Sequence, residues 1–312
     1  DLDGGDGGDG GDGGDGGDGG DGGGGTTTAG TTNGGGTETE TETETSTGGA
    51  VQGGKPVIGI DKAPTTLNPL QYGSVYEGFI IDRIYQYGTT NNPNNQEFEP
   101  WLVTDWTLNP GNAVENPDSP ALEGVTIRDD MTFHDGEDVT AEDFAFTVEY
   151  FRDQNPTQSL TGAAHQVVDS VEVQSPTELD IYMNQKEQRW FTNILGFPVL
   201  PQHIWSNVDD FTQYSPRNSD EGVVGSGAWK LADYNWQNWY ELETVDSYPV
   251  AGDADWLEDG APFVDGLRFE IFGSQNALEQ ALLNGELDAG YVSSGVTVNT
   301  AVEAEQNENL TV

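Results

Sequence analysis

Cysteine is absent from the 312 residues of this chain. Disulfide bonds, thiolate metal sites and cysteine nucleophiles are therefore excluded. The sequence also lacks any run of about eighteen apolar residues, so it predicts no membrane-spanning helix. The chain begins with Asp1 rather than methionine, which is typical of a processed form from which a signal peptide has been removed.

Basic residues are scarce: 10 Lys and Arg stand against 55 Asp and Glu, for a formal charge of -45. Such a charge repels phosphate backbones, so we exclude nucleic acid as a partner. Disorder and adaptation to molar salt are two explanations of the acidity. An aromatic content of 10% supports a folded core, and salt near 1 M shortens the screening length to about 3 Å. We therefore favour a folded protein of an extreme halophile.

Residues 1–54 have low complexity. Aspartate recurs at every third position from Asp3 to Asp21 with glycines between, and Thr alternates with Glu from Thr37 to Thr45. Neither pattern offers an apolar face that could be buried. The segment predicts a disordered, acidic, charge-extended linker, with loose cation association and O-linked sugars as alternative roles.

The most informative stretch runs from Thr132 to Phe144. Phe133 is predicted to end a strand and His134-Asp-Gly136 to form a turn. Thr140 and Asp143 then fit the capping box of a helix. Apolar residues follow with helical spacing, at Ala141, Phe144, Ala145, Val148 and Phe151.

Order is predicted to begin near Lys55, with a buried strand over residues 56–60. Residues 80–85 have helical spacing, and further strands are expected at 125–128, 170–173 and 179–182. Near the end of the chain, a strand at 267–271, a helix at 276–284 stopped by Gly285, and a strand at 287–292 predict a βαβ unit. These elements indicate an α/β fold.

Candidate ligand-binding residues follow strand ends, because ligands of open α/β sheets gather there. Glycines allow close backbone approach, and Ser, Thr and Asn offer neutral hydrogen-bonding groups. The candidates are Thr65, Thr66, Leu67, Asn68, Gly225, Ser226, Gly227, Trp229, Ser293 and Ser294. Ordinary turn chemistry is the alternative for each of them, and core packing is the alternative for at least two of Trp229, Trp236 and Trp239.

Catalytic and metal-binding signals are weak. His134, His165 and His203 show no metal-ligand spacing, and the sequence contains no serine elbow, zinc-protease or phosphate-loop motif. Adjacent acidic residues are read as solvated surface in so acidic a chain. We therefore expect no enzyme activity, no cofactor and no resident metal.

Several segments resemble, in order, the family 5 extracellular solute-binding proteins that feed peptide and nickel ABC importers. The stretch Phe133–Phe144 is similar to the family signature FHDG-x-x-x-TAEDV. One matching segment, Thr66-Leu-Asn-Pro69, precedes this signature in the chain. Three others come after it, at Val199-Leu-Pro-Gln-His-Ile-Trp205, Gly225-Ser-Gly-Ala-Trp-Lys-Leu231 and Leu283-Asn-Gly-Glu-Leu-Asp288. The resemblance covers about Val57 to Val292.

The resemblance implies a periplasmic-binding-protein type II-like lobe with an inserted β-rich subdomain. Residues 55–90 and 222–292 would form the α/β core of lobe I, residues 91–221 the insertion, and residues 293–312 the start of a truncated lobe II. It also implies an extracellular protein that captures oligopeptides or similar small polar solutes and delivers them to a membrane permease. The linker would join the protein to an N-terminal lipid anchor, its expected membrane attachment.

Length is the main departure from the family, whose members are considerably longer. A fragment, a remainder outside these 312 residues and a split gene are three explanations. A receptor that reports ligand occupancy to a sensor, and a surface structural protein that has lost the pocket, are the alternatives to a transport role.

Overall fold

The computed structural model describes residues 53–156, 162–186, 194–246, 248–249 and 262–306. The linker predicted for residues 1–54 lies outside the described residues, apart from Gly53 and Gly54. In the part of the chain that is described, no helix is long and apolar enough to cross a membrane.

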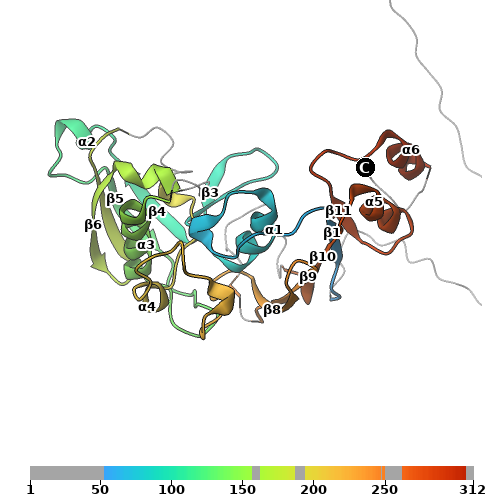
Figure 1. Cartoon of the computed structure of the whole chain (residues 1–312). Helices are drawn as coiled ribbons and strands as arrows, with labels where there is room; N and C mark the ends of the chain where they lie inside the picture. Colours follow the sequence, from blue (N-terminus) through green and yellow to red (C-terminus); the bar gives the residue numbers. More distant parts are fainter. Residues whose placement is uncertain (1–52, 157–161, 187–193, 247, 250–261, 307–312) are drawn as a thin grey trace, which may run out of the picture. The chain divides into compact units, whose positions relative to one another are not determined.

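A five-stranded mixed sheet contains the first strand of the described chain and the predicted βαβ unit (Figure 1). Strand β1 runs parallel to both β10 and β11, whereas β9 pairs antiparallel with β10 and with β8. The order across the sheet is β11 (Ala289–Tyr291), β1 (Val57–Ile60), β10 (Gly266–Ile271), β9 (Trp239–Thr244) and β8 (Trp229–Asn235). The strands predicted near residues 57, 267 and 287 therefore share one sheet, with β1 between the other two.

Helix α5 (Gln275–Leu283) connects β10 to β11. Its first turn is capped by Ser274, whose hydroxyl accepts a hydrogen bond from the Ala277 amide at 3.3 Å. Gly285 follows the helix at φ +72°, a conformation that glycine adopts without steric cost, as the sequence predicted. Leu278 and Ala281 of α5 pack on Leu287, and a last helix, α6 (Val298–Glu305), contacts α5.

A second sheet is antiparallel and has four strands. Its order is β4 (Val103–Leu108), β5 (Leu122–Ile127), β7 (Glu178–Met183) and β6 (Val168–Ser175). The strands predicted at 170–173 and 179–182 lie within β6 and β7, which pair antiparallel. A short ladder of β2 (Thr89–Asn91) and β3 (Phe98–Pro100) precedes this sheet in the chain.

Helix α3 (Ala141–Gln154) packs against the four-stranded sheet at β6 and β7 (Figure 1). All five apolar residues of its predicted stripe are buried. The Asp143 carboxylate accepts hydrogen bonds from the Thr140 amide at 3.0 Å and its hydroxyl at 2.8 Å, which confirms the predicted cap. The strand predicted to end at Phe133 is wrong. Strand β5 ends at Ile127, and Thr132 forms an isolated bridge with Asp138 around the turn.

One hydrophobic core serves both large sheets. It includes Tyr240 and Phe269 of the first sheet and Val125 and Ile181 of the second. Helix α1 (Val75–Ile84) contributes buried Ile80, Ile81 and Ile84 and contacts β8. Further helical turns include η1 (Pro69–Gln71), α2 (Asn112–Glu115), η2 (Gly162–Val167), α4 (Gln202–Trp205) and η4 (Pro216–Asn218).

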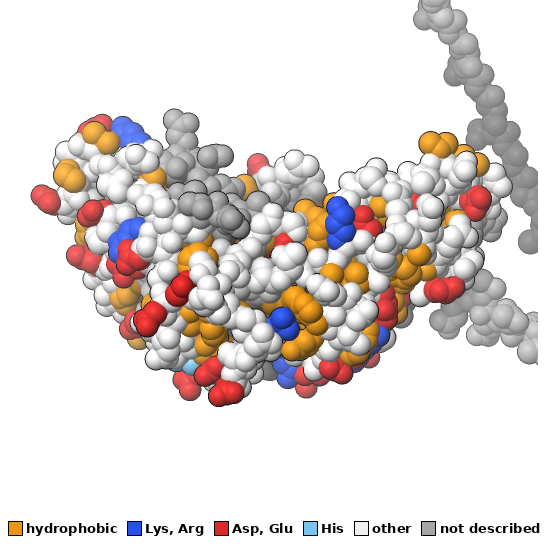
Figure 2. All heavy atoms as spheres, viewed as in Figure 1, with side chains coloured by type: hydrophobic (Ala, Val, Ile, Leu, Met, Phe, Trp, Pro, Cys, Tyr) orange, Lys and Arg blue, Asp and Glu red, His pale blue; other side chains and the backbone are white. Residues whose placement is uncertain are grey.

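The surface carries the excess of negative charge. Figure 2 shows acidic side chains distributed over the visible face, with few Lys or Arg among them. Arg217 lies over the ring of Trp236, 3.8 Å from the ring centroid, and Arg268 lies over Trp239 at 4.2 Å. Part of the scarce positive charge is therefore engaged in aromatic and carboxylate contacts of the first sheet.

Candidate functional site

The carboxyl ends of β1 and β11 meet at the side chain of Asp61. The Ser293 hydroxyl donates to Asp61 Oδ2 at 3.1 Å, and the Tyr76 hydroxyl donates to Asp61 Oδ1 at 2.6 Å. Burial opposes ionisation of Asp61, but these hydrogen bonds outweigh it and lower the pKa of the carboxyl. The strand ends therefore present an ionised carboxylate beside exposed Ser293.

Thr65 and Thr66 lie in the polar segment that follows β1. The amide and the hydroxyl of Thr65 both donate to Glu77 Oε1 at 2.8 Å. Glu77 is buried in the first turn of α1, and the Ser74 hydroxyl donates to its second oxygen. The Thr66 hydroxyl accepts a hydrogen bond from the Asn68 amide at 3.0 Å. Thr65 remains exposed, and Thr66 is half-buried.

Leu67 and Asn68 are buried, with relative exposures of 1% and 0%. The Asn68 amide group donates to the carbonyls of Phe211 and Tyr214, both at 3.0 Å. Its side-chain oxygen accepts the Leu70 amide at 2.9 Å and so caps the turn η1. Asn68 therefore ties the end of β1 to a loop more than 140 residues away.

Gly225, Ser226 and Gly227 are buried against the last turn of α1. A Cβ on Gly225 would lie 2.2 Å from the Ile84 carbonyl oxygen, and a Cβ on Gly227 would lie 2.4 Å from that of Arg83. The Gly227 amide donates to the Ile84 carbonyl at 2.8 Å. Glycine is thus required here for close packing of two backbones.

His134 holds this glycine segment from its other side. Its Nδ1 accepts the Gly225 amide at 3.3 Å, and its Nε2 lies 3.0 Å from the Gly227 carbonyl oxygen. A neutral imidazole with its proton on Nε2 satisfies both contacts. Burial lowers the pKa of His134, although the Gly227 carbonyl acts in the opposite direction. The histidine was predicted to organise its own turn, whereas it also connects that turn to residues 225–227.

Helix α1 separates the predicted site residues into two groups. Thr65 and Ser293 are linked to its first turn through Glu77 and Tyr76, whereas Gly225–Gly227 contact its last turn at Ile84. The rise of an α-helix places these two ends about 11 Å apart. The structure therefore links Thr65 and Ser293 to the same end of α1, and the glycine segment to the other end.

The three tryptophans also differ in position. Trp229 and Trp236 pack against the core, and Trp236 meets the Tyr240 ring edge-on at 5.7 Å. The Trp229 indole N–H and the Ser226 hydroxyl are both buried, and neither has a hydrogen-bond partner among the described residues.

Ser294, the last of the predicted site residues, is exposed, and its hydroxyl donates to Gln275 Oε1 at 2.7 Å.

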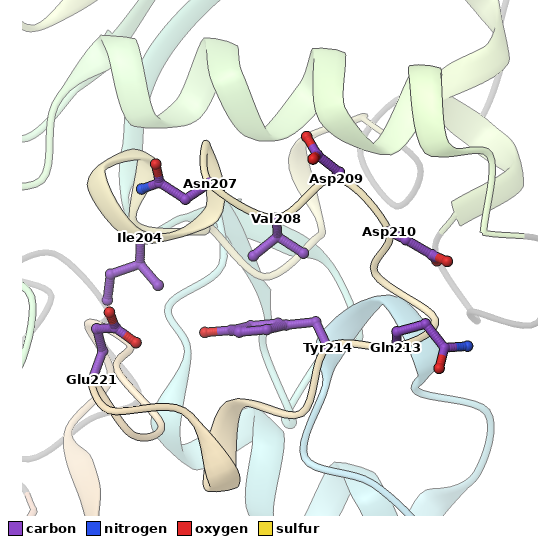
Figure 3. Close-up of a pocket in the computed structure, with 8 residues that line it drawn as sticks. All are labelled: Ile204, Asn207, Val208, Asp209, Asp210, Gln213, Tyr214 and Glu221. Carbon is purple, nitrogen blue, oxygen red and sulfur yellow. The ribbon is translucent and has the colours of Figure 1, made fainter.

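A pocket of about 490 Å³ lies elsewhere, within residues 204–221. In Figure 3, Val208 points toward the Tyr214 ring, Ile204 and Glu221 lie near the Tyr214 hydroxyl, and Asp209, Asp210 and Gln213 lie toward the other end. None of the predicted site residues lines this pocket, to which Asn207 also contributes. Asp210 accepts the Thr212 amide at 2.9 Å, so part of the acidic lining stabilises its own loop.

No group of three or more His, Asp or Glu side chains able to hold a metal ion occurs in the described ranges. His203 Nε2 lies 2.8 Å from Asp135 Oδ2, which pairs α4 with the turn after Phe133. These contacts give His134 and His203 structural partners.

Sequence reasoning missed Asp61, Tyr76 and Glu77, the side chains that join the strand ends to α1. Asp61 directly follows β1, so its position at a strand end was a signal for it. Tyr76 and Glu77 carried no such signal, because they lie on a helix among many other acidic and aromatic residues.

The fold is similar to several solved structures. The oligopeptide-binding protein AppA from Bacillus subtilis, in complex with a nonapeptide, aligns with a TM-score of 0.65 at 22% identity, over 82% of this chain and 47% of that one. NikZ from Campylobacter jejuni, in complex with Ni(L-His), aligns with a TM-score of 0.64 at 20% identity, over 81% of this chain and 45% of that one. The predicted periplasmic-binding-protein type II-like α/β fold is thereby confirmed.

Sequence comparison also gives AppA, together with a second peptide-binding relative. The chain is 23% identical to Bacillus subtilis AppA over 240 residues, which is 76% of this chain and 40% of that protein. It is 27% identical over 183 residues to YejA of Agrobacterium fabrum, a probable peptide-binding protein, covering 56% of this chain and 28% of that one. The chain thus spans less than half the length of these relatives.

The family described as bacterial extracellular solute-binding proteins, family 5 Middle, matches residues 97–312. This match covers more than half of the chain and includes the Phe133–Phe144 signature. The chain therefore belongs to family 5 of the extracellular solute-binding proteins.

Proposed function

We propose that this chain is part of the extracellular substrate-binding component of an ABC importer. It would capture an oligopeptide or a similar small polar solute and pass it, chemically unchanged, to a membrane permease. The observation that carries this proposal is the convergence of neutral hydroxyls on the strand ends around Asp61. Family membership and the peptide-binding relatives support it.

The proposed ligand contacts are the accessible members of the predicted set, Thr65, Thr66, Ser293 and Ser294. Asp61 joins them, because its carboxylate can receive a ligand N–H or ammonium group. Hydrogen bonds to a peptide main chain would make capture tolerant of the ligand's sequence. Buried Leu67 and Asn68 would support this site from behind. Gly225, Ser226, Gly227 and Trp229, on the side of the last turn of α1, remain a separate group of candidates.

The rest of the proposal concerns location and organisation. Residues 55–90 and 222–292 are assigned to lobe I, residues 91–221 to its insertion and residues 293–312 to the start of lobe II. Residues 1–54 would be the linker to an N-terminal lipid anchor on the outer face of the membrane. The charge of -45 supports a halophilic source, and we propose an archaeon.

Ligand-dependent thermal stabilisation tests the binding role. The 312-residue chain is melted at high salt with and without defined tetra- to nonapeptides, and free amino acids serve as the control. Peptides at 100 times their Kd would stabilise the folded chain by about 2.7 kcal/mol. Peptide-independent melting would favour a surface structural protein, and peptide cleavage during the assay would contradict a role in binding alone. A receptor for a sensor would bind peptides equally, and copurification with a permease would separate the two.

A further inference from the structure

The segment Ser293–Thr297, here called the exit segment, leads from β11 to α6 and carries two of the proposed ligand contacts. Side chains of other elements hold it along its length. Asp61 accepts the Ser293 hydroxyl, and Gln275 binds both the Ser294 hydroxyl at 2.7 Å and the Gly295 carbonyl at 2.8 Å. The last anchor is Glu279, which accepts the Thr297 amide at 2.8 Å.

Glu279 is unusual because it is a buried carboxylate, with a relative exposure of 3%. No salt bridge within the described part of the chain includes it. Hydrogen bonds satisfy it instead: Thr297 also donates its hydroxyl at 2.9 Å, Thr300 donates its hydroxyl at 2.5 Å, and Gln275 donates its amide at 2.7 Å. Burial opposes ionisation, yet these donors lower the pKa of Glu279 to about 2.

A carboxylate is a costly choice for this position. The neighbouring buried residues of α5, Leu278 and Ala281, are apolar, and an apolar side chain at 279 would need no hydrogen bonds. A buried charge with fixed donors instead specifies one geometry. The donors come from two helices, since Gln275 lies on α5 and Thr297 caps α6. The Glu279 carboxylate therefore connects α5 with the end of the exit segment.

We propose that Glu279 is a positioning residue that fixes the exit segment against α5 and so sets the place of Ser293 and Ser294 in the candidate site. It acts through Thr297 and Gln275 and makes no contact with ligand itself. The consequence for ligand binding rests on the proposed function, whereas the positioning of the segment does not.

Hydrogen exchange of the ligand-free 312-residue chain tests the inference. Glu279→Ala removes the acceptor, and Glu303→Ala, which removes an exposed carboxylate from α6, is the matched control. Thr300→Val removes a single donor and keeps the side-chain volume. We expect Glu279→Ala to speed exchange at residues 293–297 about tenfold, Thr300→Val to speed it several-fold at the same amides, and Glu303→Ala to leave it unchanged.

A purely structural role in α6 would give a different pattern. Faster exchange confined to residues 298–306, with residues 293–295 unchanged, would overturn the proposal, as would an equal effect of Glu303→Ala. If Glu279→Ala fails to fold, hydrogen exchange of the Thr300→Val variant at residues 293–297 tests the proposal instead. Because no ligand is present, a failure here is distinguishable from a failure to bind peptides.

Discussion

The Ser293 hydroxyl donates a hydrogen bond of 3.1 Å to the Asp61 carboxylate, although 232 positions separate the two residues. Asp61 follows β1 and Ser293 follows β11, and these neighbouring parallel strands end at the same edge of the sheet. Tyr76 donates to the other carboxylate oxygen at 2.6 Å. One acidic side chain therefore organises the strand ends and the start of α1.

Asp61→Asn is expected to weaken peptide binding about tenfold, because the amide replaces one acceptor oxygen by a donor. Isothermal titration of the variant with a peptide that stabilises the wild type is the measurement. Asp129→Asn, an equal change of charge at an exposed residue, is expected to leave affinity unchanged. Equal affinities of both variants would contradict a role of Asp61 at the site.

Gly225→Ala is expected to destabilise the chain by about 2 kcal/mol or more, because the new methyl group would collide with the Ile84 carbonyl. Urea unfolding measures the change. Gly273→Ala is the matched control, since its Cβ would have no atom within 4 Å and its stability should stay equal or rise slightly. A Gly225→Ala variant as stable as the wild type would show that the backbone at residues 83–84 can shift to accommodate the methyl group.

Asp143→Ala is expected to cost about 2 kcal/mol, because Asp143 serves two segments. It accepts the Thr140 amide at the start of α3 and the Gln202 amide, at 2.9 Å, at the start of α4. Thermal unfolding compares it with Glu142→Ala, which truncates the exposed neighbour in the same helical turn. If both variants lost a similar amount of stability, the effect would come from negative charge near the helix N-terminus and not from the hydrogen bonds of Asp143.

Glu279 predicts a specific acid sensitivity. Its pKa falls from 4.5 to about 2 on folding, so its contribution to stability is complete above about pH 4.5 and is lost as the pH falls toward 2. Between pH 5 and about pH 2 the wild type should lose about 2 kcal/mol more stability than Glu279→Gln. Urea titrations at a series of pH values measure this difference, and parallel curves for the two proteins would refute it.

Salt should stabilise the chain strongly. Raising KCl from about 0.1 M to about 1 M shortens the screening length from about 10 Å to about 3 Å and weakens repulsion within a charge of -45. We expect the melting temperature to rise by about 5 °C or more. Sorbitol at equal osmolality is the control, and an equal rise in sorbitol would assign the effect to solvent exclusion instead of screening.

Local patterns predicted much of this fold. The strand patterns at 170–173 and 179–182, the cap at Thr140 and the stop at Gly285 each depend on neighbours in the chain, so the elements they mark were found. The strand ends drew attention to Thr65 and Ser293 for the same reason.

Contacts between distant segments were not predictable in this way. His134 meets a backbone 91 to 93 residues away, and the glycines at 225 and 227 reflect close packing on α1. Glu279 escaped notice because, among 55 acidic residues, no local pattern distinguishes a buried, hydrogen-bonded carboxylate from a solvated one. Asp61 follows a predicted strand, but its hydrogen bonds to Tyr76 and Ser293 could not be foreseen from that position alone. Their roles follow only from tertiary structure.

The hydrophobic core passes without a break from Phe269 in the five-stranded sheet to Ile181 in the four-stranded one. Each sheet covers part of the other's apolar face. Unfolding of one sheet would therefore expose the other to water. Changes of side-chain volume in one sheet are consequently felt in the second. The segment between β1 and β8 thus cannot be shortened freely, because it supplies most of the buried residues of this core.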